Sequence, residues 1–138
     1  MAKLKKSKPL PSLPKLKEKL QLVFNEFVRL RDLNRPCISC GSRGYLQAGH
    51  YFAVKGYDGL RFDEDNVNGE CAACNYYNES HLIGYGDNLR VKIGEKRYNA
   101  LKERAADYKK NGYKWSRIEL MELIEKYSEK VRLMKKDL

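Results

Sequence analysis

The pattern of apolar positions divides the chain into two amphipathic segments and a middle part without a helical period. In KLKEKLQLVFNEFVRLRDL the apolar residues alternate in steps of four and three: Leu16, Leu20, Val23, Phe27 and Leu30. Near the C-terminus a second stripe has similar spacing: Ile118, Met121, Ile124, Tyr127, Val131 and Met134. Such spacing places side chains on one face of a helix. Both stripes therefore predict helices that pack in an ordinary core or along a dimer seam.

Polar residues mark the ends of the predicted helices. Asn34 and Pro36 stop the first helix. Ser116 and Glu119 have the spacing of a capping box at the start of the last helix. Before it, the segment GEKRYNALKERAADYKKNG begins with an acidic residue, is rich in Ala, Lys and Glu, and ends in an Asn-Gly pair. The last third of the chain is therefore predicted to be helical.

The middle of the chain has a different composition. From Cys37 to about Asn68 it is rich in glycine, aspartate and aromatic residues. GYLQAGHYFAV, at 44–54, predicts a short β-hairpin, and KGYDGLRFDEDNVNG has the composition of loops and turns. A helix is expected through AACNYYNESHL, after Cys71. We therefore expect an α+β fold with a flexible basic arm over 1–14, a helix over 15–34, a core over 35–92 and a helical region over 93–138.

The length and hydropathy limit the class of protein. The 138 residues fit one domain, or a compact core with helical extensions. No apolar run approaches the length of a membrane span, and the start lacks the apolar core of a signal peptide. We therefore expect a cytoplasmic protein with no membrane partner, in a compartment where thiols stay reduced.

Charge is unevenly distributed along the chain. The formal net charge is +10, yet residues 36–81 contain three basic and six acidic residues, a net charge of −3. The flanks hold the remaining 25 basic and 12 acidic residues, a net charge of +13. An acidic centre between basic flanks suits a cation site held against a polyanion. The simpler interpretation is that the charge serves solubility, but the pattern favours nucleic acid as the partner.

Two cysteine pairs suggest a metal site. CISC at 37–40 and CAAC at 71–74 are separated by thirty residues, so the expected ligands are Cys37, Cys40, Cys71 and Cys74. Each pair forms a tight turn around one metal, and two pairs complete a tetrahedral thiolate site for Zn²⁺. Such a zinc would be structural, because four thiolates leave no position for water. Disulfides, another metal or coincidence are the alternatives.

The insert between the cysteine pairs is where chemistry would have to occur. It contains His50, one of two histidines in the chain, and the asparagines Asn66 and Asn68. A lone histidine is more often a structural residue than a catalyst. The position of His50 between two knuckles, in a predicted hairpin, favours a functional role.

In their order, these motifs resemble a known family. A cysteine pair, then GH on a strand, then DN before a second CxxC with a polar residue next, is the layout of zinc-stabilised HNH endonucleases of the ββα-metal class. In CISCG, QAGHYF, LRF…N and C…CN the chain is similar to the phage NinG (Rap) recombination proteins. The resemblance covers about residues 35–125. It implies a small zinc-knuckle ββα-metal core with flanking helices, in the host cytoplasm, that cuts branched DNA such as Holliday junctions and D-loops.

The resemblance also implies roles for three residues of the insert. His50 matches the general base, which takes a proton from water at the scissile phosphate. Asn66 matches the asparagine that ties the loop to the hairpin and helps fix the imidazole. Asn75 matches the last metal-ligand position, where the phage endonuclease VII branch also has asparagine. An amide oxygen is a hard ligand that suits Mg²⁺ or Mn²⁺, although asparagine also caps helices and turns.

The sequence departs from the HNH pattern immediately before His50. Many relatives have a metal-binding aspartate there, whereas this chain has Gly49. Glu79 ranks first as the missing ligand, because on a helix it would share a face with Asn75. The alternatives are His50 itself and a set of polar residues: Asp63, Asp65, Glu70 and Asn78. His81 is interpreted as structural or facing phosphate.

Cations in the flanks are the expected DNA contacts. Lys3, Lys5, Lys6 and Lys8 in the arm can neutralise phosphates, as can Arg29, Arg31 and Arg35 near the end of the first helix. A homodimer would place paired cuts on a branched substrate, and host or phage recombination proteins are possible partners. Two rivals are a non-catalytic zinc-knuckle DNA-binding accessory protein and a protein–protein scaffold that uses the helical tail.

Overall fold

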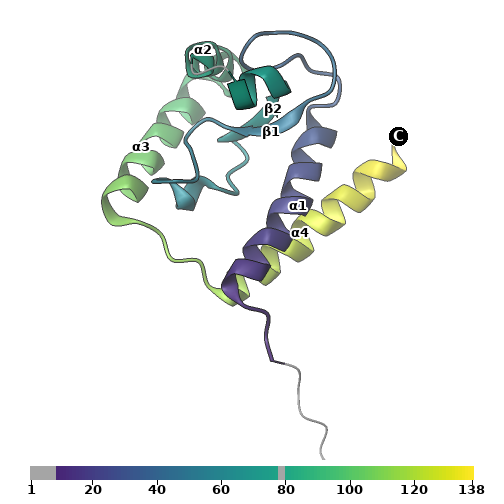
Figure 1. Cartoon of the computed structure of the whole chain (residues 1–138), viewed down its shortest axis with the longest axis vertical. Coiled ribbons are helices and arrows are strands. Elements are labelled where there is room, and N and C mark those ends of the chain that lie inside the picture. The colour runs from purple at the N-terminus through teal and green to yellow at the C-terminus, as the bar shows by residue number, and fades with distance from the viewer. Residues whose placement is uncertain (1–8, 78–79) are drawn as a thin grey trace, which may run out of the picture.

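The structure, a computed structural model, describes residues 9–77 and 80–138. In chain order its elements are α1 (Leu13–Arg31), β1 (Gln47–His50), a 3₁₀ turn (Asp58–Leu60), β2 (Val67–Glu70), a π-helical turn (Ala73–Tyr77), α2 (His81–Ile93), α3 (Glu95–Asn111) and α4 (Arg117–Lys136). Within these ranges helices predominate and the strands form one two-stranded sheet, so the expected α+β class is confirmed. Figure 1 shows the sheet between the α1/α4 pair and the α2/α3 pair.

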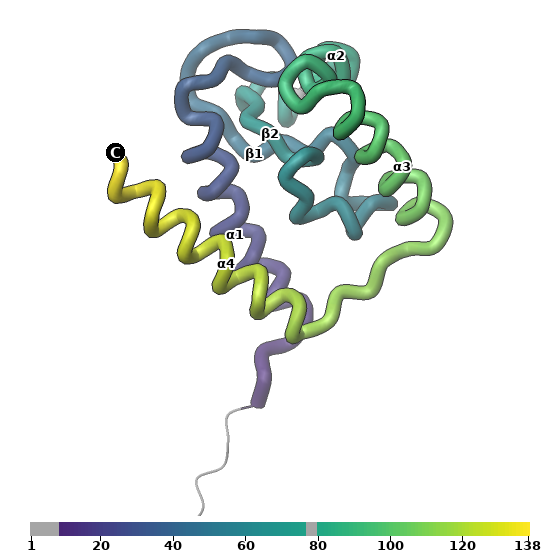
Figure 2. The backbone as a smooth tube through the Cα atoms, turned by 180° about the vertical axis from the view of Figure 1, so that it is seen from behind, coloured from purple at the N-terminus to yellow at the C-terminus, as the bar shows by residue number. Residues whose placement is uncertain are grey.

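Helices α1 and α4 lie side by side and run in the same direction (Figures 1 and 2). Arg117 at the start of α4 donates to the Pro11 carbonyl, and Lys135 near its end pairs with Glu26. The shared core holds buried residues of both helices, of the connection between the strands and of β2: Leu16, Leu20, Phe24, Phe27, Val28, Phe62, Val67, Leu120, Tyr127 and Val131. The two predicted stripes therefore pack against each other within one chain.

The stripe predicted for α4 is correct only in part. Tyr127 and Val131 are buried, but Ile118 is 70% exposed and Met121 is 42% exposed. Leu120, which lies outside the predicted stripe, is fully buried instead. The Ser116 hydroxyl accepts a hydrogen bond from the Glu119 backbone amide and caps the helix as expected. The buried face of α4 thus runs through Leu120, Tyr127 and Val131. In the first turn of the helix, Leu120 faces the core in place of the predicted Ile118 and Met121.

Helix ends differ slightly from the expected segments. Ser12 caps α1 by accepting from the Lys15 amide, so residues 13 and 14, expected in the arm, belong to the first turn of the helix. Helix α1 ends at Arg31, before Asn34 and Pro36. The predicted stop after α3 is confirmed, because Gly112 follows Asn111 with a φ of +70°, which favours glycine.

The hairpin expected within residues 44–54 is wrong in its second strand. Strand β1 pairs antiparallel with β2, with Gln47 opposite Glu70 and His50 opposite Val67. The partner strand therefore comes from the segment that was expected to be loop. Residues 51–66 form the connection, and the Tyr51 amide donates to the Asn66 carbonyl where it closes. Pattern alone missed this pairing because the connection is long and contains its own turns.

The two faces of the hairpin contact different helices. Ala48 and Val67 join the core of α1 and α4. On the other face, the buried Tyr85 hydroxyl of α2 donates to the Gly49 carbonyl at 2.6 Å and accepts from Asn68 Nδ2 at 3.1 Å. A second hydrophobic cluster lies on this side: Ile38, Leu60, Tyr85, Leu89, Tyr98, Leu101 and Ala105. The end of β1 is thus fixed from both sides.

Helix α2 also packs directly against the first cysteine pair. A Cβ atom added to Gly84 would overlap the Ser39 carbonyl oxygen, and Asn88 Nδ2 donates to the Ile38 carbonyl at 2.8 Å. Glycine at 84 therefore permits the close approach. Of the segment 72–82, expected as one helix, the described residues form a short π-helical turn (Ala73–Tyr77) and the start of α2 at His81. Among the helices of the described ranges, none has the length and apolar character needed to cross a membrane.

Candidate functional site

The four cysteines come together at the base of the hairpin. Their Sγ atoms all lie within 4.8 Å of one another. Cys40 Sγ and Cys71 Sγ are 3.8 Å apart. A tetrahedral site with Zn–S bonds of about 2.3 Å has sulfur–sulfur edges of about 3.8 Å, so this distance fits. The group can therefore hold one zinc ion, with Cys37 and Cys74 buried and Cys40 exposed.

Backbone hydrogen bonds shape the first knuckle. The Gly41 amide donates to the Cys37 carbonyl at 2.9 Å, and Gly41 has a φ of +76°, which favours glycine. The Cys71 amide donates to Cys37 Sγ at 3.2 Å and so links the two knuckles directly. Burial raises the pKa of the Cys37 thiol, whereas hydrogen bonding with Ser42 lowers that of Cys40 to about 6.

His50 lies at the end of β1 with its ring half-buried. Its Nε2 atom is 3.0 Å from the Arg61 carbonyl oxygen. Because a carbonyl only accepts hydrogen bonds, Nε2 carries the proton and the neutral ring keeps a lone pair on Nδ1. Burial lowers the pKa of His50 and outweighs the Arg61 hydrogen bond, which favours the charged form. The imidazole is thus neutral at pH 7 and able to take a proton.

Asn66 is fully buried, and its side chain joins two parts of the connection between the strands. Its Oδ1 atom accepts from the Phe52 amide at 2.8 Å, and its Nδ2 atom donates to the carbonyls of Phe52 and Leu60. Phe52 lies two residues after His50, and Leu60 lies immediately before Arg61. Asn66 therefore fixes both stretches of chain that position the imidazole, and its part in catalysis stays a prediction.

Asn75 lies on the π-helical turn, half-buried. Its backbone amide donates to the Cys71 carbonyl at 2.9 Å, and its Nδ2 atom donates to Gln47 Oε1 at 3.0 Å. The side chain therefore bridges the second knuckle and strand β1. With Nδ2 bound to Gln47, Oδ1 is the atom of Asn75 that can serve a metal ion. Glu79 and Asn78 lie outside the described residues.

A contact between the buried Glu70 and the half-buried His81, which the sequence did not predict, lies on the same side of the hairpin as α2. Glu70 Oε2 is 2.6 Å from His81 Nδ1 and accepts a hydrogen bond from the Ser39 hydroxyl. His81 and His50 line one pocket of about 390 Å³ together with Tyr51, Phe52, Ala53, Tyr57 and Leu82. The two histidines, thirty-one residues apart, thus border a common space. The spacing of the sequence gave no signal for this, because the strand pairing was not predicted.

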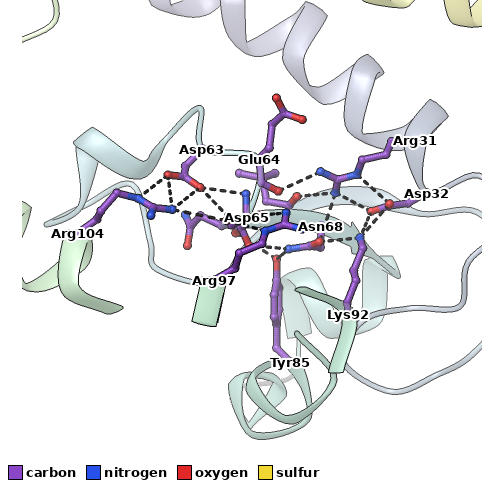
Figure 3. Close-up of polar contacts among 12 residues, drawn as sticks. Arg31, Asp32, Asp63, Glu64, Asp65, Asn68, Tyr85, Lys92, Arg97 and Arg104 are labelled. Carbon is purple, nitrogen blue, oxygen red and sulfur yellow. Dashed lines mark hydrogen bonds and ion pairs between the residues drawn. The ribbon is translucent and has the colours of Figure 1, made fainter. Parts of the chain in front are cut away.

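The acidic turn after Phe62 is engaged with the flanking helices (Figure 3). Both oxygens of Asp63 accept from Arg104 of α3, and Asp65 pairs with Arg97 of the same helix. Glu64 accepts from Tyr127 of α4 at 2.9 Å. These contacts give the acidic residues structural partners. They also show that part of the positive charge in the flanks neutralises the acidic centre.

Arg31 has a structural position rather than a free one (Figure 3). Its guanidinium donates to both carboxylate oxygens of Asp32 and to the carbonyls of Glu64 and Val67. Lys92 of α2 also donates to both oxygens of Asp32, at 2.9 Å. Arg31 can therefore contact DNA only in addition to this role.

The remaining cations expected to contact DNA fall into two groups. Arg29 is half-buried, whereas the Arg35 side chain is 57% exposed and lies 4.0 Å from Asp32 Oδ1. The arm lysines lie outside the described residues: Lys3, Lys5, Lys6 and Lys8. DNA contact stays a prediction for all of these residues.

Comparison with known proteins identifies relatives. The family described as Bacteriophage Lambda NinG protein matches residues 1–137. The protein ninG of Escherichia phage 933W is 34% identical over 114 residues, which cover 81% of this chain and 54% of that protein. The protein ninG of Escherichia phage lambda is 32% identical over 114 residues, covering 81% of this chain and 53% of that protein. The chain thus spans about half the length of the curated relatives it matches. No solved structure matches it.

Proposed function

This chain belongs to the NinG family of bacteriophage proteins, and from that membership we propose that it is a structure-selective DNA endonuclease. It hydrolyses phosphodiester bonds of branched recombination intermediates, such as Holliday junctions and D-loops, with the help of a divalent cation. Its relation to the HNH endonucleases is part of this proposal. So are its branched substrate, a homodimeric state and a cytoplasmic site of action.

The observation that carries the proposal is the state of His50. Its proton is assigned to Nε2 by the Arg61 carbonyl at 3.0 Å, and burial keeps the ring neutral. A neutral imidazole with a free lone pair at the edge of a pocket is what a general base for water requires. The pocket that His50 lines, with a volume of about 390 Å³, leaves room for a water molecule beside the ring.

The other residues hold this base in place. Asn66 fixes the chain on both sides of the imidazole through three hydrogen bonds. The cysteine cluster joins residues 37–40 to residues 71–74, so a zinc ion there fixes the hairpin relative to the turn that carries Asn75. In the reaction, His50 takes a proton from water, which then attacks phosphorus while the bond to the leaving oxygen breaks.

The residues also fit a catalytic cation of the hard class. Asn75 offers an amide oxygen on a turn whose position is fixed by Cys71 and Gln47. When bound, Mg²⁺ or Mn²⁺ would stabilise the negative charge that develops on the phosphate and leaving oxygens. The net charge of +10 favours association with the polyanionic substrate.

One observation favours a non-catalytic, DNA-binding accessory role instead. Within the described residues, the four cysteines are the only group in which three or more ligand atoms of His, Cys, Asp or Glu lie close together. A second, catalytic cation would thus be held by at most two His, Cys, Asp or Glu side chains of the described residues. Binding to junctions without cutting under any condition would establish this rival.

The test is cleavage by the purified, zinc-loaded chain. Four-way junctions and linear duplexes of the same sequence are incubated with and without Mg²⁺ or Mn²⁺. We expect the junction to be cut only when the cation is present. His50→Ala should abolish cutting while one zinc per chain and junction binding are retained.

Matched asparagine variants provide the control. Asn75→Ala should lose cutting, whereas Asn99→Ala, at an exposed position of α3, should cut normally. Unchanged cutting by His50→Ala would refute the assigned base. Absence of DNA affinity at moderate salt would instead indicate a protein–protein scaffold.

A further inference from the structure

Glu70 is a fully buried carboxylate with one unsatisfied oxygen. Its exposure is 0%, and Oε1 has no hydrogen-bond partner among the described residues, where it is the only such buried side-chain atom. Its other oxygen, Oε2, contacts Ser39 and His81. An unsatisfied oxygen on a buried carboxylate is unfavourable unless a cation, a proton or a water satisfies it.

Gly49 leaves room for this oxygen. A Cβ atom added to Gly49 would overlap Glu70 Oε1 and would lie 2.8 Å from Glu70 Cβ. The φ of Gly49 is not positive, so the backbone itself does not demand glycine there. Glycine at 49 is therefore explained by the carboxylate that occupies the space of its side chain.

A second hard donor lies on the same face of the hairpin. Gln47 pairs with Glu70 across the strands, and Gly49 follows two positions later, so all three share one face. Asn75 is bound to Gln47 through Nδ2 and keeps Oδ1 as a ligand atom. Asn75 is therefore bound to a side chain on the same sheet face as the unsatisfied carboxylate oxygen.

We propose that Glu70 Oε1 and Asn75 Oδ1 hold a hard divalent cation, Mg²⁺ or Mn²⁺, on this face. Oxygen donors are the ligands such ions prefer, and Mg²⁺ is commonly held by one or two protein groups while it keeps several waters. Ser39 and His81 act as positioning residues, because hydrogen bonds to a ligating carboxylate fix its orientation. The inference takes its need for a cation from the proposed function, but binding alone tests it.

The experiment is a titration of the zinc-loaded chain with Mn²⁺ in the absence of DNA. Electron paramagnetic resonance measures the concentration of free Mn²⁺ at each step. Glu70→Gln has the same shape and keeps an acceptor for Ser39 and His81. It should weaken Mn²⁺ binding at least about tenfold, with one zinc per chain retained. Mg²⁺ should raise the melting temperature of the wild type and leave that of Glu70→Gln unchanged. The matched control, Glu103→Gln at an exposed position of α3, should bind Mn²⁺ as the wild type does.

A double variant guards against a folding defect. Gly49→Asp combined with Glu70→Ala returns a carboxylate to the same space from the opposite strand, and it should restore Mn²⁺ binding lost in Glu70→Ala. Equal Mn²⁺ affinity in Glu70→Gln and wild type would overturn the inference, as would loss of binding in Glu103→Gln alone. If the wild type cuts junctions while Glu70→Gln binds Mn²⁺ normally, the nuclease proposal stands and this one fails. If Glu70→Gln loses Mn²⁺ binding but the wild type cuts no junction, the cation site stands and the nuclease proposal fails.

Discussion

Replacing Asp32 with asparagine is expected to destabilise the fold strongly. Asp32 follows the last turn of α1, and its side chain is 1% exposed. Its carboxylate accepts from Arg31 and Lys92, and also from the Gly69 amide of β2 at 2.8 Å. The substitution removes the one negative charge that holds two cations of different helices against the hairpin (Figure 3).

The magnitude follows from the pKa of Asp32. Burial alone would raise this pKa, but hydrogen bonds and charges from Arg31 and Lys92 outweigh it and lower the pKa from 3.8 to about 2. A decrease of this size corresponds to about 2 kcal/mol of stability at neutral pH. Leaving the two cations without a counter-charge raises the expected loss to about 3–5 kcal/mol, or a melting temperature lower by about 10–17 °C.

The assay is urea unfolding of the zinc-loaded chain at pH 7, with Asp87→Asn as the control. Asp87 is exposed on α2, so that variant should stay within about 0.5 kcal/mol of the wild type. Because the folded pKa of Asp32 lies below the unfolded value, its contribution is present above about pH 4 and is lost toward pH 2. The difference in unfolding free energy between Asp32→Asn and the wild type should therefore become smaller as the pH falls from about 4 toward 2. A difference in unfolding free energy below about 0.5 kcal/mol at pH 7 would show that Asp32 does not hold the two cations in this way.

Three further predictions test the knuckles and the cations. Gly84→Ala places a Cβ against the Ser39 carbonyl, so it should cost about 1–3 kcal/mol in urea unfolding and speed zinc loss to a chelator. Arg31→Ala should lower the melting temperature, whereas Arg35→Ala should leave it unchanged. Arg35→Ala should instead reduce the salt dependence of DNA binding by about one phosphate contact. Equal melting temperatures of the two variants would contradict this contrast. Cys74→Ser should reduce zinc content below one per chain by mass spectrometry and lower helicity, since a closed thiolate site stabilises the fold. Full zinc content in that variant would contradict the assigned ligand set.

The helices were predictable from sequence because their signals are local. The spacing of Leu16, Leu20 and Phe27 and the Asn111–Gly112 stop each depend on residues within a few positions. The buried face of α4 was less predictable, because the angle at which it crosses α1 decides whether Leu120 or Met121 is covered. That choice is made by packing between distant segments.

The cysteine cluster was predictable and the hairpin was not. CxxC spacing restricts each pair to a turn around one ion, whatever lies between the pairs. Strand β2 contains Asn68, Gly69 and Glu70, residues of low strand propensity, and it forms because Asp32 accepts from the Gly69 amide and Tyr85 contacts Asn68. Tertiary contacts therefore override local preference at this strand.

The unpredicted strand also concealed part of the candidate site. Without the pairing of Gln47 with Glu70, no local pattern indicates that Glu70 lies beside Gly49 or that His81 and His50 line one pocket. The acidic turn was likewise considered for metal binding, although Asp63 and Asp65 are bound by Arg104 and Arg97. The charge pattern indicated a polyanion partner and did not reveal these internal pairs.

The most direct test of the central claim is single-turnover cleavage of a four-way junction by the zinc-loaded chain in Mg²⁺, compared with His50→Ala. We expect the wild type to cut near the branch point, and the variant to bind the junction and zinc equally well but to leave the strands intact. Intact strands with wild-type protein in both Mg²⁺ and Mn²⁺, or equal cleavage by His50→Ala, would contradict the central claim.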